Sequence, residues 1–388
     1  MTTPQPTHGA TKPLAGIRVL TLEQFGAGPY GTMLLAELGA EVIKIEPPGG
    51  DPSRRVGPHL LGDDDSQYFQ AWNLGKKSVA LDLKSDTGRR DFEALVRTAD
   101  CVVNNLRGTQ PAKLGLDYAA LKPVNPRIVC LHISAYGRAG PRADWPGYDF
   151  LMQAEAGLVE LTGDPEGPPT RVGASMIDSM SGLTGALGLL ACLLRARVTG
   201  EGCDVETCLF DVALHQLTYA GTWYLNEGEV APRLPRSAHL SLAPVQTFPT
   251  ADGWIFVMCM TQKFWLSLVD ALGRRELLAD PRFADPNTRA VHRAALTEAL
   301  DPTFRARTTA DWLERLGGLL PVAPVHRLDQ ALDSPFVRET GMVSDVAHSA
   351  RGRLRVIANP LRIDGARPTQ TACAPLGADS ATFTGRTP

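Results

Sequence analysis

One acidic residue, Asp178, lies among small and apolar residues where a charged side chain is unusual. The stretch RVGASMIDSMSG runs from Arg171 to Gly182 and leads into the apolar run LTGALGLLACLL. Burial of an ionised carboxylate costs free energy, so an acid in such surroundings is held by a partner or is used as a reactive group. An Asp before a helix also accepts hydrogen bonds from the first turn as an N-cap. The residues around Asp178 leave both roles open.

A second pattern with possible chemistry is GAGPYG, which spells G-x-G-x-x-G at Gly26, Gly28 and Gly31. Glu46 follows Gly26 by twenty residues, the spacing of a nicotinamide dinucleotide site with an acid on the ribose hydroxyls. Pro29 counts against this interpretation, because it removes a backbone N–H donor where a phosphate would bind. An NAD-dependent oxidoreductase is therefore one candidate function. A tight strand-to-helix turn, whose glycines permit positive φ and close packing, is the alternative.

The elements that must position these residues alternate between strand and helix. The predicted strands are residues 16–23, 41–48, 77–83, 100–106 and 126–137, and the predicted helices are 32–40 and 87–99. Residues 24–31, which contain the glycines, are predicted as a loop. A strand, a helix and a strand within about thirty residues form a right-handed βαβ unit. The pattern predicts an α/β fold, with a parallel sheet that helices cover on both faces.

The second half of the chain predicts a different arrangement. Residues 200–226 are predicted as a short strand and a helix, and they are followed by loops, a hairpin built on Asp252-Gly253 and helical segments over 262–318. We expect a large Rossmann-like domain whose first part is 1–224, a smaller α+β domain over 225–320, and a linker and return to the large domain over 321–388.

Composition excludes several classes of protein. The net charge is −3 and basic residues are spread along the chain, which argues against a nucleic-acid-binding surface. The N-terminal stretch lacks the apolar core of a signal peptide, and the apolar runs are short and interrupted by glycine, so no membrane association is expected. The seven cysteines form no CxxC pair and no metal set, so we expect no metal and reduced thiols in the cytoplasm.

Several segments together resemble the family III CoA-transferases, also called the CaiB/BaiF family. The matching segments are PLAGIRVLTLEQFGAGPYGTMLLAELGAEVIKIEPPGGDP, NLGKKSVALDLKSDTGR, ADCVVNNLRGTQPAKLGLDY, NPRIVCLHISAYG, GYDFLMQAEAGL and ASMIDSMSGLTGALGLLACLLRARVTGEG. They cover about half of the chain in the family's order. The resemblance implies a Rossmann-like large domain that binds CoA rather than a dinucleotide, and a small domain in the middle of the chain. It also implies an interlocked dimer, a homodimer or a pair of unlike chains.

The resemblance places the family's nucleophile at Asp178. A carboxylate can attack the thioester of an acyl-CoA to give an aspartyl anhydride and then an aspartyl-CoA thioester, which an acceptor acid resolves. CoA thioesters are then substrates, and no tightly bound cofactor is expected. For CoA binding, the resemblance implies Gly26, Ala27, Leu81, Asp82, Leu83, Lys84, Asn105, Leu106, Arg107 and Lys113. Arg54 or Arg55 could supply a phosphate contact where some relatives have a basic residue after the second strand; a solvated charged loop is the alternative.

The motif GYDF separates two activities within this resemblance. Racemases and epimerases of the family carry a His before that Asp, whereas here the position is Tyr148. A phenol with a pKa of about 10 is a poor base at neutral pH, so CoA transfer is expected and acyl-CoA racemisation is the alternative. Tyr148 and Asp149 are expected at the thioester site; a Tyr148 buried beside the core is the other interpretation.

The nature of the acids is suggested only by nearby cationic groups. Arg171, Arg236 and His239 could hold a second carboxylate, which favours a dicarboxylic acceptor with succinyl-CoA as donor.

Overall fold

The described chain, residues 12–385 of a computed structural model, packs as two units. The large unit holds the described residues up to Ala156, Gly173–Gln216 and the residues from Pro335 onward, and the small unit holds Gly157–Val172 and Leu217–Ser334. The predicted boundaries lie at 224/225 and 320/321. The chain instead changes unit after Gln216 and after Ser334, and the segment 157–172, predicted in the large domain, packs with the small unit.

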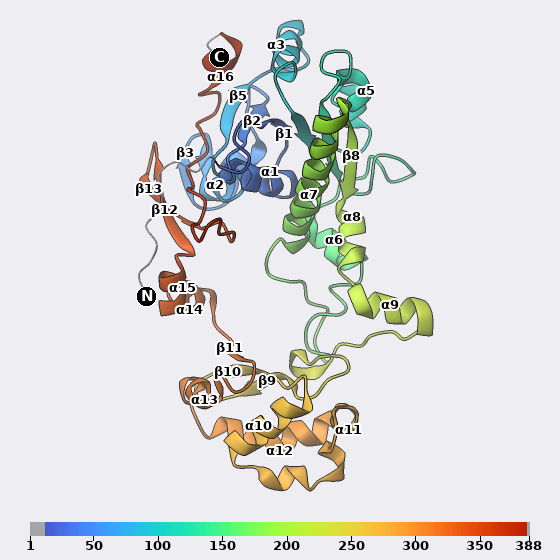
Figure 1. Cartoon of the computed structure of the whole chain (residues 1–388), viewed down its shortest axis with the longest axis vertical. Coiled ribbons are helices and arrows are strands. Elements are labelled where there is room, and N and C mark those ends of the chain that lie inside the picture. The colour runs from blue at the N-terminus through green and yellow to red at the C-terminus, as the bar shows by residue number, and fades with distance from the viewer. Residues whose placement is uncertain (1–11, 386–388) are drawn as a thin grey trace. The chain divides into compact units, whose positions relative to one another are not determined.

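A six-stranded parallel sheet forms the centre of the large unit (Figure 1). Its strands are β1 (Arg18–Leu22), β2 (Glu41–Glu46), β5 (Lys77–Ala80), β6 (Cys101–Asn104), β7 (Val129–Ser134) and β8 (Cys203–Cys208). They pair in the order β5-β2-β1-β6-β7-β8, so that β8 is an edge strand. Counted within this sheet, the order is 3-2-1-4-5-6, that of dinucleotide-binding α/β folds. The predicted α/β class is confirmed.

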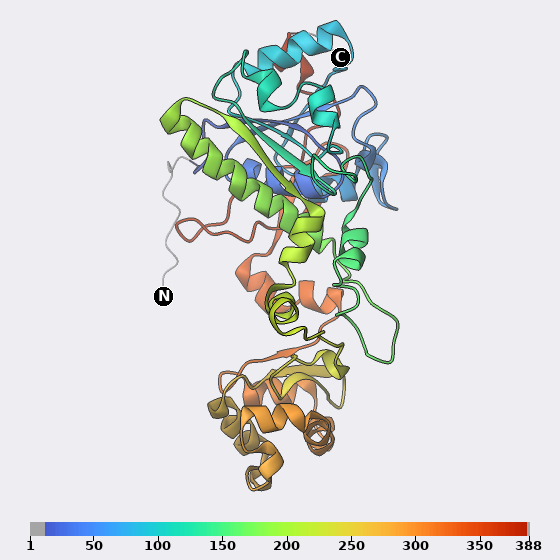
Figure 2. The same cartoon turned by 90° about the vertical axis from the view of Figure 1, so that its right-hand side faces the viewer.

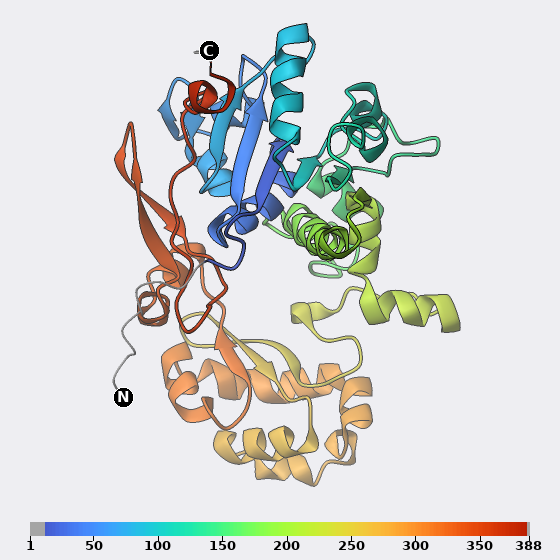
Figure 3. The ribbon, with the colours of Figure 1, turned by 45° about the horizontal axis from the view of Figure 1, so that its top comes forward.

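Helices cover both faces of the sheet, as Figure 3 shows. Phe92 of α3 (Asp86–Val96) packs in one cluster with Leu20 and Ile43 on one face. On the other face, α7 (Met176–Thr199) brings Gly185 against Ile133, and α1 (Ala27–Glu37) packs on α7. Burial on both faces explains why the central strands appear in the sequence as continuous apolar runs.

Helix α1 begins earlier than predicted. Gly28 and Gly31 lie inside the helix rather than in a loop, and the helix ends at Glu37 instead of residue 40. The glycines serve packing: a Cβ on Gly31 would lie 2.4 Å from the carbonyl oxygen of Gly182 on α7. Gly26, Gly28 and Gly31 do not take positive φ. The stretch that looked like a phosphate-binding loop is therefore a helix–helix crossing.

Helix α7 is longer than the apolar run in the sequence suggested. Its 24 residues are long and apolar enough to cross a membrane by length and composition. Its inner face packs on α1 and β7, as in the core helix of a globular protein. An outer stripe of apolar residues stays exposed on this helix, namely Leu183, Leu187, Leu194 and Val198.

The remaining elements of the large unit are short. Its further helices are α2 (Gln67–Asn73), α4 (Gln110–Lys113), α5 (Tyr118–Leu121), α6 (Asp149–Glu155), α8 (Leu209–His215), α15 (Pro335–Thr340), α16 (Ser380–Thr384) and the 3-10 turn η1 (Pro52–Arg55). Two antiparallel pairs complete it, β3 (Leu60–Gly62) with β4 (Asp65–Ser66) and β12 (Val343–His348) with β13 (Gly352–Ile357).

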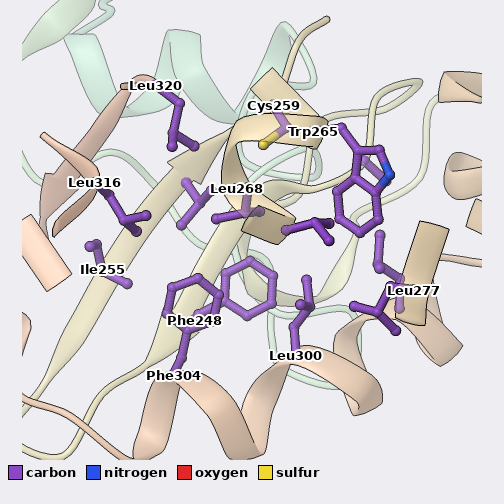
Figure 4. Close-up of a cluster of buried hydrophobic side chains, with 14 of the residues drawn as sticks. Phe248, Ile255, Cys259, Trp265, Leu268, Leu277, Leu300, Phe304, Leu316 and Leu320 are labelled. Atoms are coloured by element: carbon purple, nitrogen blue, oxygen red, sulfur yellow. The ribbon is translucent and has the colours of Figure 1, made fainter. Parts of the chain in front are cut away.

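The small unit is α+β, with a three-stranded antiparallel sheet and its own core. The strands are β9 (Val245–Pro249), β10 (Trp254–Met258) and β11 (Val322–Pro324), and β9 and β10 form the predicted hairpin. Its helical segments are α9 (Thr218–Glu227), α10 (Gln262–Leu272), α11 (Pro286–Val291), α12 (Arg293–Arg305), α13 (Thr309–Leu316), α14 (Leu328–Leu332), η2 (Pro235–Ser237), η3 (Arg275–Leu278) and η4 (Pro281–Phe283). Figure 4 shows the core, in which the stacked rings of Phe248 and Phe304 belong to one cluster with Leu268 and Trp265.

Candidate active site

The site lies where the strand order of the large sheet reverses, between β1 and β6. Ligands of open α/β sheets bind in the crevice that this reversal leaves at the carboxyl ends of the strands. Gln24 follows β1 and Asn105 follows β6, and the two join across the crevice. The Gln24 N–H donates to Asn105 Oδ1 at 2.8 Å, and Asn105 Nδ2 donates to the Gln24 carbonyl at 2.6 Å. This pair of bonds fixes the two loops on either side of the reversal point.

A cavity of about 340 Å³ opens between these loops. Seven of the predicted site residues line it, namely Gly26, Ala27, Asn105, Leu106, Arg107, Tyr148 and Asp178. Its walls also contain residues that the sequence interpretation missed, namely Gln24, Phe25, Gln110, Ile133, Ser134, Ala135, Trp145, Pro146, Gly147 and Leu209. The missed polar residues Gln24 and Ser134 follow or end parallel strands, and that position was a signal available in the sequence.

Asp178 lies in the first turn of α7 and is not its N-cap. The N-cap is Ser175, and the helix begins at Met176. The interpretation of Asp178 as the N-cap is therefore wrong, because Asp178 lies three residues inside the helix. The half-buried side chain of Asp178 lines the cavity instead. The negative charge still lies near the positive end of a helix dipole, which favours the ionised form.

Gly26 makes room for the carboxylate of Asp178. A Cβ on Gly26 would lie 2.3 Å from Asp178 Oδ2, closer than any real contact. A Cβ on Gly28 would likewise lie 2.9 Å from Glu23 Oε2. The glycine pattern thus has a physical cause that concerns Asp178 and helix packing rather than a dinucleotide.

Asp149 holds the backbone of Asp178. Its Oδ2 accepts the backbone N–H of Asp178 at 2.8 Å, and its Oδ1 accepts Gln153 Nε2 at 2.6 Å. It is 3% exposed and is not among the residues that line the cavity, so it acts on the site through Asp178. Arg142 holds the far end of α6, through two hydrogen bonds to Glu155 at 2.5 and 2.6 Å.

Burial and the neighbouring Asp149 raise the pKa of Asp178 to about 7. Burial is the larger cause, because the ionised carboxylate loses hydration, and repulsion by the Asp149 carboxylate adds to it. A carboxylate that is poorly solvated and ionises near neutral pH is a better nucleophile than one at the surface.

Tyr148 stands at the mouth of the cavity. It is 57% exposed, so the interpretation of a core tyrosine is wrong. Its ring meets Phe25 edge to face, with centroids 5.8 Å apart. As the residue before α6, it places an aromatic ring beside the loop that carries Gly26.

A second cavity of about 170 Å³ adjoins the first, and Gln24 and Leu106 belong to the walls of both. Leu81, Asp82, Leu83 and Lys84 line it together with Leu22, Ile45 and Leu114. The structure thus brings the predicted LDLK segment to the same crevice as Asp178. Lys113, at the end of α4, is not among the lining residues of either cavity.

Of the two arginines predicted as alternatives for a phosphate contact, Arg54 is not available in this structure. Arg54 is fully buried, and its guanidinium forms two hydrogen bonds to Glu46, at 2.7 and 2.6 Å. Arg55 pairs with Asp64 at the surface. Because Glu46 is neutralised by Arg54 and also accepts the Ser78 hydroxyl, it cannot serve the ribose of NAD as the glycine pattern suggested. The acidic residue that a dinucleotide site requires is therefore missing.

Two of the groups predicted to hold a second carboxylate, Arg236 and His239, do not offer a free positive charge. In the small unit, Arg236 forms a bidentate pair with Asp301, at 2.7 and 2.6 Å. Burial and the charge of Arg293 lower the pKa of His239, so that this imidazole is neutral at pH 7. Arg171 donates to the carbonyl of Val172 at 2.9 Å. Within residues 12–385, no three His, Cys, Asp or Glu residues are arranged to bind a metal.

Known proteins resemble this chain over most of its length. The model of CoA-transferase family III matches residues 14–380. The chain is 33% identical to the succinate–glutarate CoA-transferase of Agrobacterium fabrum, over 86% of this chain and 85% of that protein. It is 34% identical to the acetyl-CoA:oxalate CoA-transferase of Acetobacter aceti, over 94% and 92%.

Solved structures agree with these relatives. A CaiB/BaiF family protein from Brucella suis superposes with a TM-score of 0.84 at 32% identity, covering 96% of this chain and 99% of that one. Rv3272 from Mycobacterium tuberculosis superposes with a TM-score of 0.85 at 31% identity, covering 97% and 100%. With the strand order, the crevice and these matches in agreement, the chain belongs to CoA-transferase family III.

Proposed function

We propose that this protein moves CoA from an acyl-CoA to a small carboxylic acid, with Asp178 as the nucleophile. The observation that carries the proposal is the place of Asp178: its poorly hydrated carboxylate faces a cavity that continues toward the LDLK segment, and its backbone N–H is held by Asp149 Oδ2. A carboxylate in that position can reach a thioester carbonyl while the rest of CoA lies along the crevice.

The reaction proceeds through covalent aspartyl intermediates. An Asp178 oxygen attacks the thioester carbon, the C–S bond breaks, and CoA thiolate leaves behind a mixed anhydride. The thiolate attacks the Asp178 Cγ carbonyl and expels the donor acid, which gives an aspartyl-CoA thioester. The acceptor carboxylate repeats both steps in reverse, so that acyl-CoA is released and the Asp178 carboxylate is restored without net proton transfer.

The start of α1 can stabilise the negative charge that forms on each tetrahedral oxygen. The first N–H groups of a helix have no acceptor within the helix, and Ala27 places one of them in the cavity wall. Pro29 has no N–H, so this role falls to the residues before it. Gln24, whose side chain carries an amide group, lines the same cavity.

A trapping experiment tests the nucleophile. Enzyme that is first incubated with acyl-CoA is treated with hydroxylamine or borohydride, and its peptides are mapped by mass spectrometry. We expect the hydroxamate or the reduced side chain at residue 178, and none in Asp178→Asn. The matched control Asp144→Asn, which changes an exposed acid near the cavity, should still be labelled at residue 178. Labelling at another residue would contradict the proposal.

For the acids, we propose small dicarboxylates with succinyl-CoA as donor. This choice of acids is supported by the relatives, which are named for succinate and glutarate, oxalate, and mesaconate. Arg236 and His239 do not support it, because Arg236 is paired with Asp301 and His239 is neutral. A panel of acids assayed against several acyl-CoA donors tests this. A preference for monocarboxylic acids would contradict it.

We further propose that the chain forms a homodimer. The exposed apolar stripe of α7 supports a covered face, and the family resemblance supports an interlocked arrangement. Light scattering should give twice the chain mass of 41.7 kDa. A monomer, or co-purification with an unlike chain, would contradict the homodimer.

A further inference from the structure

The C-terminal half of α7 lies directly against the edge strand β8. The two elements are consecutive in the chain and run antiparallel, as Figures 1 and 2 show. At their contact, a Cβ on Gly188 would lie 3.0 Å from Val205 Cγ1, so helix and strand approach closely there. This contact sets which residues face each other farther along both elements.

Two cysteines occupy the next facing positions. Cys192 follows Gly188 by one helical turn, and Cys203 precedes Val205 by two residues, on the same side of the strand. Burial and, after it, the neighbouring Cys192 thiol raise the pKa of the Cys203 thiol. Neither residue belongs to the cavities described above.

These two thiols are also the accessible ones. Of the seven cysteines, all of which lie within residues 12–385, Cys192 and Cys203 are partly exposed and the other five are buried. Burial raises the pKa of Cys101 and Cys130, on the neighbouring strands, which keeps these thiols protonated and unreactive. A reagent in solution therefore reaches the pair before any other thiol.

We propose that Cys192 and Cys203 form a reversible disulfide when the protein meets a low-molecular-weight disulfide such as oxidised glutathione. One cysteine thiolate attacks a glutathione sulfur, forms a mixed disulfide and releases one glutathione. The second cysteine thiolate attacks the protein sulfur of that mixed disulfide, closes the internal S–S bond and releases the second glutathione. The two protein thiols are oxidised, the small disulfide is reduced, and the two protons end on the released thiols.

The link would fasten α7 to the sheet edge across the glycine turn at Gly200 and Gly202. Only ten residues separate the two cysteines, so the closed loop is short. Closure of such a loop restricts the unfolded chain, and we expect the melting temperature to rise by roughly 3–8 °C on oxidation and to return on reduction. Burial and contact with Cys192 raise the pKa of Cys203, so oxidation should be faster at mildly alkaline pH.

The test uses full-length protein incubated with oxidised glutathione and digested with trypsin without reduction. Arg195 and Arg197 lie between the cysteines, so the digest should contain two peptides joined by a disulfide between residues 192 and 203. Cys192→Ser and Cys203→Ser should each lose the joined peptides and the rise in melting temperature. The matched control is Cys208→Ser, since Cys208 lies on the same tryptic peptide as Cys203 and caps α8 in a way that serine can replace.

The expected result is the 192–203 link in the wild type and in Cys208→Ser. Two results would overturn the inference: glutathione attached to Cys192 or Cys203 with no internal link, or a link that joins a different pair of cysteines. A melting temperature that stays unchanged when the link has formed would overturn the fastening of α7 to β8.

Discussion

Asp149 Oδ2 accepts the backbone N–H of Asp178 at 2.8 Å, so that one carboxylate holds the helical turn that carries the other. The same proximity raises the pKa of Asp178 through repulsion between the two acids. Positioning and electrostatics are therefore coupled in one contact. A variant of Asp149 that keeps the acceptor and removes the charge can separate the two effects.

Asp178→Asn should lose CoA transfer by roughly 10³-fold or more and still bind CoA, because the amide keeps the shape without the nucleophile. A rate of CoA transfer in Asp178→Asn comparable with that of the wild type would contradict the assignment of Asp178 as the nucleophile.

The same variant, Asp178→Asn, should be more stable than the wild type at pH 8. The folded pKa of Asp178 is about 7 and the unfolded value is 3.8, so the wild type loses stability as pH rises through this window. We expect a gain of about 1–3 kcal/mol from denaturant unfolding.

The rate of transfer should depend on the ionisation of Asp178. Only the carboxylate attacks, so kcat/KM should fall about tenfold per pH unit below the Asp178 pKa of about 7. Asp149→Asn removes the charge that repels the Asp178 carboxylate but leaves an amide oxygen to accept the Asp178 N–H. The midpoint of the plot of kcat/KM against pH should therefore move to lower pH. A profile that is flat between pH 5 and 8, or a midpoint that rises in Asp149→Asn, would disagree with this account.

Gly26→Ala should slow turnover by roughly 10- to 100-fold, because its methyl group would occupy the space of Asp178 Oδ2 and displace the carboxylate. The matched control is Gly49→Ala, where an added Cβ meets nothing within 4 Å. Steady-state kinetics of both variants with one acyl-CoA and one acid checks the prediction. Equal activity of Gly26→Ala and wild type would show that the close approach does not matter.

CoA should raise the melting temperature of the protein, whereas NAD and NADP at the same concentration should not. A ligand that binds the folded state at a hundred times its Kd stabilises it by about 2.7 kcal/mol. Glu46 is committed to Arg54, so the acid needed for a nicotinamide ribose is missing. A shift with NAD and none with CoA would restore the oxidoreductase interpretation.

A 2-methylacyl-CoA incubated with enzyme in heavy water should gain no deuterium at Cα while CoA moves between acids. A racemase must remove the α-proton, and the residue at the family's His position is the exposed phenol of Tyr148, a poor base at neutral pH. Mass spectrometry of the recovered substrate measures the exchange. Deuterium uptake as fast as turnover would favour racemisation.

Much of the fold follows from local patterns in the sequence. Apolar strands that alternate with amphipathic helices specify a parallel α/β sheet, because each pattern concerns residues that are neighbours in the chain. Asp178 could likewise be singled out, since a lone acid among Gly, Ser, Met and Ile is unusual whatever its tertiary contacts.

Contacts between distant residues decided the rest. Gly26 approaches Asp178, Gly31 approaches Gly182, and Arg54 folds onto Glu46. Local sequence leaves such pairings open, because a glycine that permits a turn and one that permits a close contact look alike in the sequence. Only the packing of α1 on α7 turned an apparent dinucleotide motif into space for a carboxylate, and only the approach of α6 placed Asp149 against the backbone N–H of Asp178.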